Sequence, residues 1–73
     1  MAQKIKIYIP DYDNKVEVTF EAYQDTFDFF WDITIHYVFD LKTLHYISDL
    51  TQTQTDAIHE EIEFYMENLD NYD

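Results

Sequence analysis

The residues best suited to chemistry in this chain are carboxylates near its C-terminal end. Asp56, Glu60, Glu63, Glu67 and Asp70 recur at spacings of three or four residues, which places them on one face of an α-helix. Such a row could supply acid-base groups or attract a basic protein. Since the chain has 16 Asp and Glu residues, carboxylate pairs alone do not indicate catalysis.

Two short segments resemble metal sites, and both are incomplete. His59 and Glu63 form an i,i+4 pair, but the second histidine that a zincin helix needs is missing. The segment 11–15 begins like a calcium loop, yet it has Lys at its fifth position and no turn glycine. We therefore expect neither a metal nor a cofactor.

The composition also excludes several classes of enzyme. The chain has no Gly, so it cannot form a P-loop or a dinucleotide-binding loop, both of which need close approach of the backbone to phosphate. It has no Cys to act as a thiol nucleophile and no Arg to clamp an anionic substrate. We expect a binding protein and not an enzyme.

The net charge of −12 is spread unevenly. Segment 1–24 carries −1, segment 25–50 carries −4 and segment 51–73 carries −7. Such a surface repels nucleic acid and anionic membranes and attracts basic surfaces. We expect a basic protein partner and no direct contact with nucleic acid or membrane. With neither a signal peptide nor a membrane-spanning segment in the sequence, we expect a cytoplasmic protein.

Seventy-three residues provide one hydrophobic core, so a single domain over 1–73 is expected. Apolar residues alternate with polar ones over 4–9 and 16–21, a pattern typical of two strands joined as a hairpin. The lysines of the first strand are expected to lie near the glutamates of the second on the outer face.

The segment 27–39 fits both strand and helix periodicity. Its β-branched and aromatic residues favour a strand. This strand would place Phe29, Trp31, Ile33, Ile35, Tyr37 and Phe39 on the core face and Asp28, Phe30, Asp32, Thr34, His36 and Val38 on the outer face. A turn at 40–42 would lead to a shorter strand over 43–48, although a helical turn there also fits the pattern.

The last element is predicted to be an amphipathic helix. Thr51 and Gln54 match a capping box, and Ile58, Ile62, Tyr65 and Leu69 form an apolar stripe. The expected fold is therefore α+β, with an antiparallel sheet of three to four strands and one C-terminal helix packed on one face.

The candidate partner-binding surface combines acidic residues with one aromatic residue. Its members are Asp28, Asp32, Asp56, Glu60, Glu63, Phe64, Glu67 and Asp70. A charged helix face is often merely solvated, but this one has no Lys at i+4 to offset its repulsion. Phe64 lies off the apolar stripe and could anchor a partner or a second copy in a homodimer; packing against a sheet edge is the alternative.

Small size, high negative charge, many aromatics and carboxylate rows over 25–73 together resemble a functional class, the small acidic proteins that mimic DNA. Anti-restriction proteins, inhibitors of uracil-DNA glycosylase, some anti-CRISPR proteins and proteins that occupy histone-like factors belong to it, and many are phage-encoded. The resemblance implies an inhibitor that occupies the basic surface of a nucleic-acid-binding host protein, in the host cytoplasm. The alternative is a structural or interaction subunit that binds through exposed aromatics.

Overall fold

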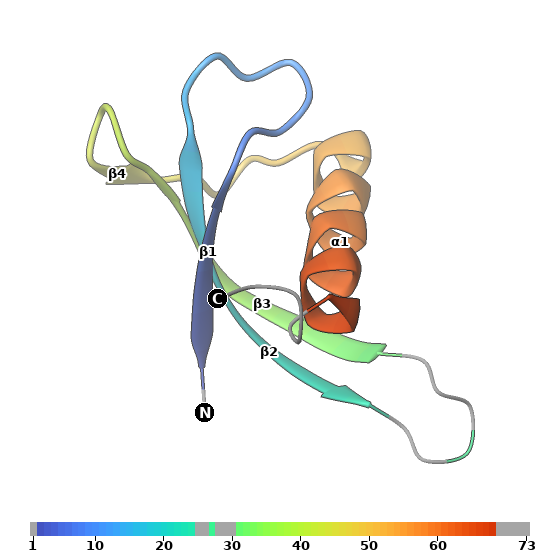
Figure 1. Ribbon diagram of the computed structural model, residues 1–73. Helices are drawn as coiled ribbons and strands as arrows, with labels where there is room; N and C mark the ends of the chain where they lie inside the picture. Colours follow the sequence, from blue (N-terminus) through green and yellow to red (C-terminus); the bar gives the residue numbers. More distant parts are fainter. Residues whose placement is uncertain (1, 25–26, 28–30, 69–73) are drawn as a thin grey trace.

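The computed structural model describes residues 2–24, 27 and 31–68 of the chain. The described part folds into four strands followed by one helix: β1 (Gln3–Ile7), β2 (Val16–Gln24), β3 (Trp31–Asp40), β4 (His45–Tyr46) and α1 (Gln52–Glu67). The strands form one antiparallel sheet in the order β1-β2-β3-β4, and α1 covers one face (Figure 1). The expected α+β fold is confirmed, and the ambiguous segment is a strand from residue 31 onward.

Strands β1 and β2 form the predicted hairpin. Ile5 lies opposite Val18 on the face toward α1, while Lys4 and Lys6 are exposed on the outer face. Lys4 Nζ lies 3.9 Å from Glu17 Oε1, as expected from the alternation. Because the Lys4 side chain is 64% exposed, this ion pair contributes at most about 1 kcal/mol to stability.

The sequence predicted correctly which side chains of β3 face the core only for the first half of the strand. Ile33 and Ile35 pack against the core as expected, but Val38, predicted to lie on the outer face, is buried. Tyr37, predicted to lie in the core, is 59% exposed. Phe39, on the same face as Tyr37, is half-buried and contacts Tyr46. The core and outer faces are thus exchanged within the strand.

A β-bulge at His36 causes this exchange. Phe20 of β2 pairs with Ile35, but the preceding residue Thr19 pairs with Tyr37, so His36 has no pairing partner across the strand. An extra residue in one strand moves every following side chain to the opposite face. The His36 ring remains on the outer side, with Nε2 3.2 Å from Glu21 Oε2.

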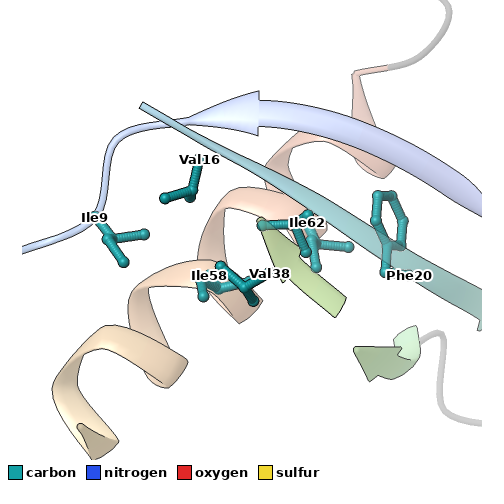
Figure 2. Close-up of a cluster of buried hydrophobic side chains, with 7 residues drawn as sticks. Ile9, Val16, Phe20, Val38, Ile58 and Ile62 are labelled. Carbon is teal, nitrogen blue, oxygen red and sulfur yellow. The ribbon is translucent and has the colours of Figure 1, made fainter. Parts of the chain in front are cut away.

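The core lies between the sheet and α1. Its buried members come from both layers and are Ile9, Val16, Val18, Phe20, Val38, Ile58 and Ile62 (Figure 2). The Phe20 ring packs edge-on against Tyr65 of α1, with centroids 6.3 Å apart. The helical stripe is thus confirmed through Tyr65, and Leu69 lies outside the described residues. Trp31, predicted to be in the core, is half-buried.

A buried carboxylate, which the sequence did not indicate, joins two connections of the sheet. Asp40 is 1% exposed; its Oδ2 accepts hydrogen bonds from the Tyr12 hydroxyl and from Asn14 Nδ2. Its Oδ1 accepts from the backbone N–H groups of Lys42 and Thr43, at 2.8 and 2.9 Å. These bonds hold the β1–β2 connection against the turn between β3 and β4.

The hydrogen bonds of Asp40 change the acidity of both partners. The Tyr12 hydroxyl, which donates to the carboxylate, is the largest influence that lowers the pKa of Asp40 well below its usual range, although burial acts in the opposite direction. The same bond raises the pKa of Tyr12 to about 12. The charged aspartate and the neutral tyrosine therefore stabilise one another across the neutral pH range.

Helix α1 begins with the predicted capping box. Thr51 Oγ1 accepts from the Gln54 backbone N–H at 3.1 Å, and Gln54 Oε1 accepts from the Thr51 N–H at 3.0 Å. Gln54 is also buried, and its Nε2 donates to the Pro10 carbonyl at 2.8 Å. The cap thus both starts the helix and fixes it against the β1–β2 connection.

We expect Thr51→Ala to lower the free energy of unfolding by about 1 kcal/mol, since the substitution removes the acceptor for the Gln54 N–H. Chemical denaturation followed by circular dichroism measures this loss. Thr53→Ala, an exposed change within the first turn, is the matched control and should leave stability equal or slightly higher. Equal stabilities of the two variants would contradict a role for the cap.

Candidate functional site

The solvent face of α1 carries a row of four carboxylates, here called the acidic ridge: Asp56, Glu60, Glu63 and Glu67. All four are exposed, and their spacing places them opposite Ile58 and Ile62, which are buried against the sheet. At 1.5 Å per residue the ridge is about 16 Å long. Asp70, its predicted fifth member, lies outside the described residues.

No positive charge offsets the acidic ridge within α1. The helix has no basic residue in its last turn, and the ion pairs found in the described part of the chain, Lys4 with Glu17 and His36 with Glu21, lie on the sheet. At the start of the ridge, Gln52 Nε2 donates a side-chain hydrogen bond to Asp56 Oδ1, at 2.8 Å. Glu67 also lies near the negative end of the helix dipole. The ridge therefore opposes folding and leaves its charges available to a partner.

Asp32, the predicted acidic member from the sheet, does not join the ridge. It is exposed and pairs with Tyr23, and because the next residue, Ile33, packs against the core, Asp32 lies on the outer face as predicted. Helix α1 covers the opposite face of the sheet (Figure 1). Asp28 lies outside the described residues, so the acidic site in the described structure is confined to the helix.

Phe64 is exposed beside the acidic ridge and lies close to the edge strand β1, so it has features of both interpretations that the sequence left open. Its side chain is 58% exposed, and it lines a groove of about 460 Å³ between α1 and β1. Glu61 and Tyr65 complete the helix side of this groove, and residues 4–7 form the other side. Phe64 thus borders both the ridge and the open side of β1.

A second aromatic surface lies on the outer face of the sheet. Tyr37, Phe39 and Tyr46 form an outer aromatic cluster, in which the Tyr46 ring lies 5.5 Å from Tyr37 and 4.9 Å from Phe39, centroid to centroid. Tyr46 is 68% exposed. The sequence did not predict this cluster, because only the bulge at His36 turns Tyr37 and Phe39 outward.

Neither of the two metal-like sequence segments forms a metal site in the described residues. No group of three or more His, Asp or Glu side chains within them is arranged to hold an ion. Across the same part of the chain, no helix has the length and apolar character needed to cross a bilayer.

Comparison of the chain with family models, curated protein sequences and solved structures finds no match. The functional argument therefore depends on the chemistry of the surfaces described above.

Proposed function

We propose that this protein inhibits a basic, nucleic-acid-binding protein by occupying the surface that normally holds DNA. The observation that carries the proposal is the acidic ridge: four exposed carboxylates in a row on a helix that has no Lys or Arg. Ordinary surface helices gain stability from pairs of opposite charge at i,i+4, and this helix has none. Its charge pattern is better suited to a positive partner than to the folding of the chain itself.

The dimensions of the ridge suit a groove that binds a phosphate backbone. Successive ridge carboxylates are three or four residues apart, which corresponds to about 5–6 Å between their Cβ atoms. One DNA strand carries a charge every 3.4 Å along the duplex axis, so the ridge offers a similar but sparser row. The net charge of −12 adds long-range attraction toward a basic surface. We place this action in the cytoplasm of a bacterial host.

The test uses the protein immobilised as bait for a bacterial lysate, with bound proteins eluted by salt or by duplex DNA. We expect DNA-binding proteins that duplex DNA displaces, because bait and DNA compete for one surface. Neutralising the ridge with Glu60→Gln, Glu63→Gln and Glu67→Gln together should weaken the purified complex at least about tenfold, since three charge contacts are lost. Affinity should also fall steeply between 0.1 and about 0.5 M salt.

The matched control removes the same amount of charge elsewhere. Asp11→Asn, Asp13→Asn and Asp49→Asn together also make the net charge less negative by three, at exposed positions outside α1. This control should keep most of the affinity. If both triple variants bind equally well, or if DNA displaces none of the captured proteins, the ridge is not a DNA mimic.

The outer aromatic cluster supports a second candidate function, an interaction subunit that binds a protein through exposed rings. Tyr37, Phe39 and Tyr46 lie together on a sheet face that α1 does not cover, and tyrosine is frequent among residues that dominate binding energy. For this function Tyr46→Ser would abolish partner binding, whereas the ridge variant would retain it even in high salt.

A further inference from the structure

Strand β1 leaves one edge of the sheet open. It pairs with β2 along one side, and the strand order places no described strand along its other side. The backbone N–H and C=O groups on such an edge readily pair with an extended segment of another protein. At the opposite edge, β4 covers the end of β3, and the Ile47 N–H extends the pairing there to the Val38 carbonyl.

The groove beside the β1 edge has apolar side chains that an added strand would bury. Ile5 and Ile7 contact the core but remain only half-buried, and they line the groove between β1 and α1. On the helix side of this groove, the Phe64 side chain is more than half exposed. Every second side chain of a strand added to β1 would point into this groove. Burial of the isoleucines and of Phe64 would stabilise the added strand.

The helix side of the groove is negative. Glu61 lines it, and helical spacing places Glu60 and Glu67, four residues before and three residues after Phe64, next to Phe64 on the surface of α1. Since α1 contains no Lys or Arg, these carboxylates have no basic neighbour on their own helix. The side chains of an added strand that point toward α1 therefore meet carboxylates, and arginine or lysine is the best match for them.

The outer face of the same edge is positive. Lys4 and Lys6 are exposed there, and Lys4 pairs with Glu17 of β2 at 3.9 Å. Side chains that an added strand placed on the outer face would lie beside these lysines, so basic residues are disfavoured at those positions. A second copy of β1 does not fit, because its own lysines would lie beside Lys4 and Lys6.

We propose that β1 binds an extended segment of a partner protein as an added strand, whose basic and apolar side chains point toward α1 and whose neutral or acidic side chains lie beside Lys4 and Lys6. The proposal rests on the proposed function in one respect, that the partner is basic. It adds which part of the partner is held and how. Main-chain hydrogen bonds along β1 supply affinity, and the groove lined by Glu61 and Phe64 selects the side chains.

The first test uses a synthetic peptide in which every second residue is threonine and the residues between are arginine, valine, valine and arginine. Its sequence reads the same from both ends, so either strand direction gives the same side-chain contacts. We expect isothermal titration calorimetry at about 0.15 M salt to give a dissociation constant below about 1 mM. A peptide of the same composition with its arginines divided between the two faces should bind at least about tenfold more weakly, because part of its charge then lies beside Lys4 and Lys6.

A second test identifies the main-chain pairing. Amides of alternate residues point to opposite edges of a strand. Methylating the backbone nitrogens of one alternate set of peptide residues should therefore abolish binding, whereas methylating the other set should leave it unchanged. Hydrogen exchange of the protein should show added protection at alternate amides of β1. Equal effects of the two methylated peptides would overturn the proposal, because a purely electrostatic contact does not distinguish the two sets.

Variants of the protein locate the contact on the helix side of the groove. Glu61→Gln and Phe64→Ala should each weaken peptide binding at least about threefold. Asp49→Asn removes the same charge as Glu61→Gln, from an exposed residue beyond β4 at the opposite edge of the sheet, and should leave the affinity unchanged. Absence of binding at about 1 mM peptide, or equal weakening by Asp49→Asn and Glu61→Gln, overturns the proposal.

These outcomes are separable from those of the proposed function. If DNA displaces the proteins captured from the lysate but the peptide does not bind, strand addition is wrong and DNA mimicry is supported. If the peptide binds through β1 but DNA displaces none of the captured proteins, DNA mimicry is wrong and strand addition is supported.

Discussion

Replacing Phe20 with alanine is expected to lower the free energy of unfolding by about 3–5 kcal/mol. Phe20 is completely buried, lies opposite Ile35 beside the bulge and packs edge-on against Tyr65 of α1. Its ring thus joins the sheet to the helix. A chain of this length has a total stability of about 4–11 kcal/mol, so the loss removes a large share of it.

The experiment is urea denaturation followed by far-ultraviolet circular dichroism. Phe64→Ala is the matched control, because it removes the same ring from an exposed position on α1. Under conditions where the chain is monomeric, we expect its stability to change by no more than about 0.5 kcal/mol. A small effect of Phe20→Ala would mean that the helix does not depend on this contact for its place on the sheet.

The second large effect concerns pH and Asp40. Because hydrogen bonding from Tyr12 lowers the pKa of Asp40 in the folded protein, its charged form contributes stability above the pKa of the unfolded chain, about 4. This contribution is lost as the pH falls through the lower, folded value. Between pH 7 and 5 the stability should instead rise as the pH falls, because a less negative chain repels itself less. We expect a stability maximum near pH 5 and a fall below pH 4.

Melting temperatures measured from pH 2 to 8 test this profile, with Asp40→Asn as the comparison. That variant should be less stable than the unmodified chain at pH 7 and should lose much of its acid dependence below pH 4. If the melting temperature of Asp40→Asn falls below pH 4 as steeply as that of the unmodified chain, other carboxylates control acid unfolding. Tyr12, with its pKa raised to about 12, should stabilise the fold below pH 10, and this contribution should disappear as the pH rises through 12.

Most of the secondary structure could be predicted from the sequence, because short-range patterns determine it. Alternation located β1 and β2, and the Thr51–Gln54 capping box located the start of α1. The periodicity of the segment that contains β3 fitted a helix as well as a strand. Its β-branched and aromatic residues favoured a strand, and this prediction is correct for Trp31–Asp40. Phe29, Phe30 and Asp28 lie outside the described residues.

The faces of β3 beyond Ile35 could not be predicted in this way. Tyr37 and Phe39 are apolar and alternate with Val38, so nothing in their spacing distinguishes a regular strand from one with a bulge. The bulge is defined by the pairing of β3 with Thr19 and Phe20 of β2. Such pairing depends on residues far away along the chain. The role of Asp40 was missed for a similar reason: its partner Tyr12 is 28 residues away along the chain.

The candidate site was partly predictable. Helical spacing alone located the acidic ridge and placed Phe64 off the apolar stripe of α1. The groove against β1 was not foreseen, because it depends on how α1 lies across the sheet. The outer aromatic cluster depends on the bulge and was likewise missed.

The bulge at His36 also limits how this chain can change during evolution. Loss of His36 would leave a regular strand, with Tyr37 still opposite Thr19 and Val38 still opposite Val18. Gain of one more residue between Ile35 and Val38 would instead shift the faces of the following residues and move Val38 and the carboxylate of Asp40 out of the interior. Such an insertion would disrupt the hydrophobic core and the hydrogen bonds of Asp40 together. Point substitutions of Tyr37 or Phe39, in contrast, alter only the outer surface. The outer sheet face can therefore diversify by substitution, whereas this strand segment can lose its bulged residue more readily than it can gain another.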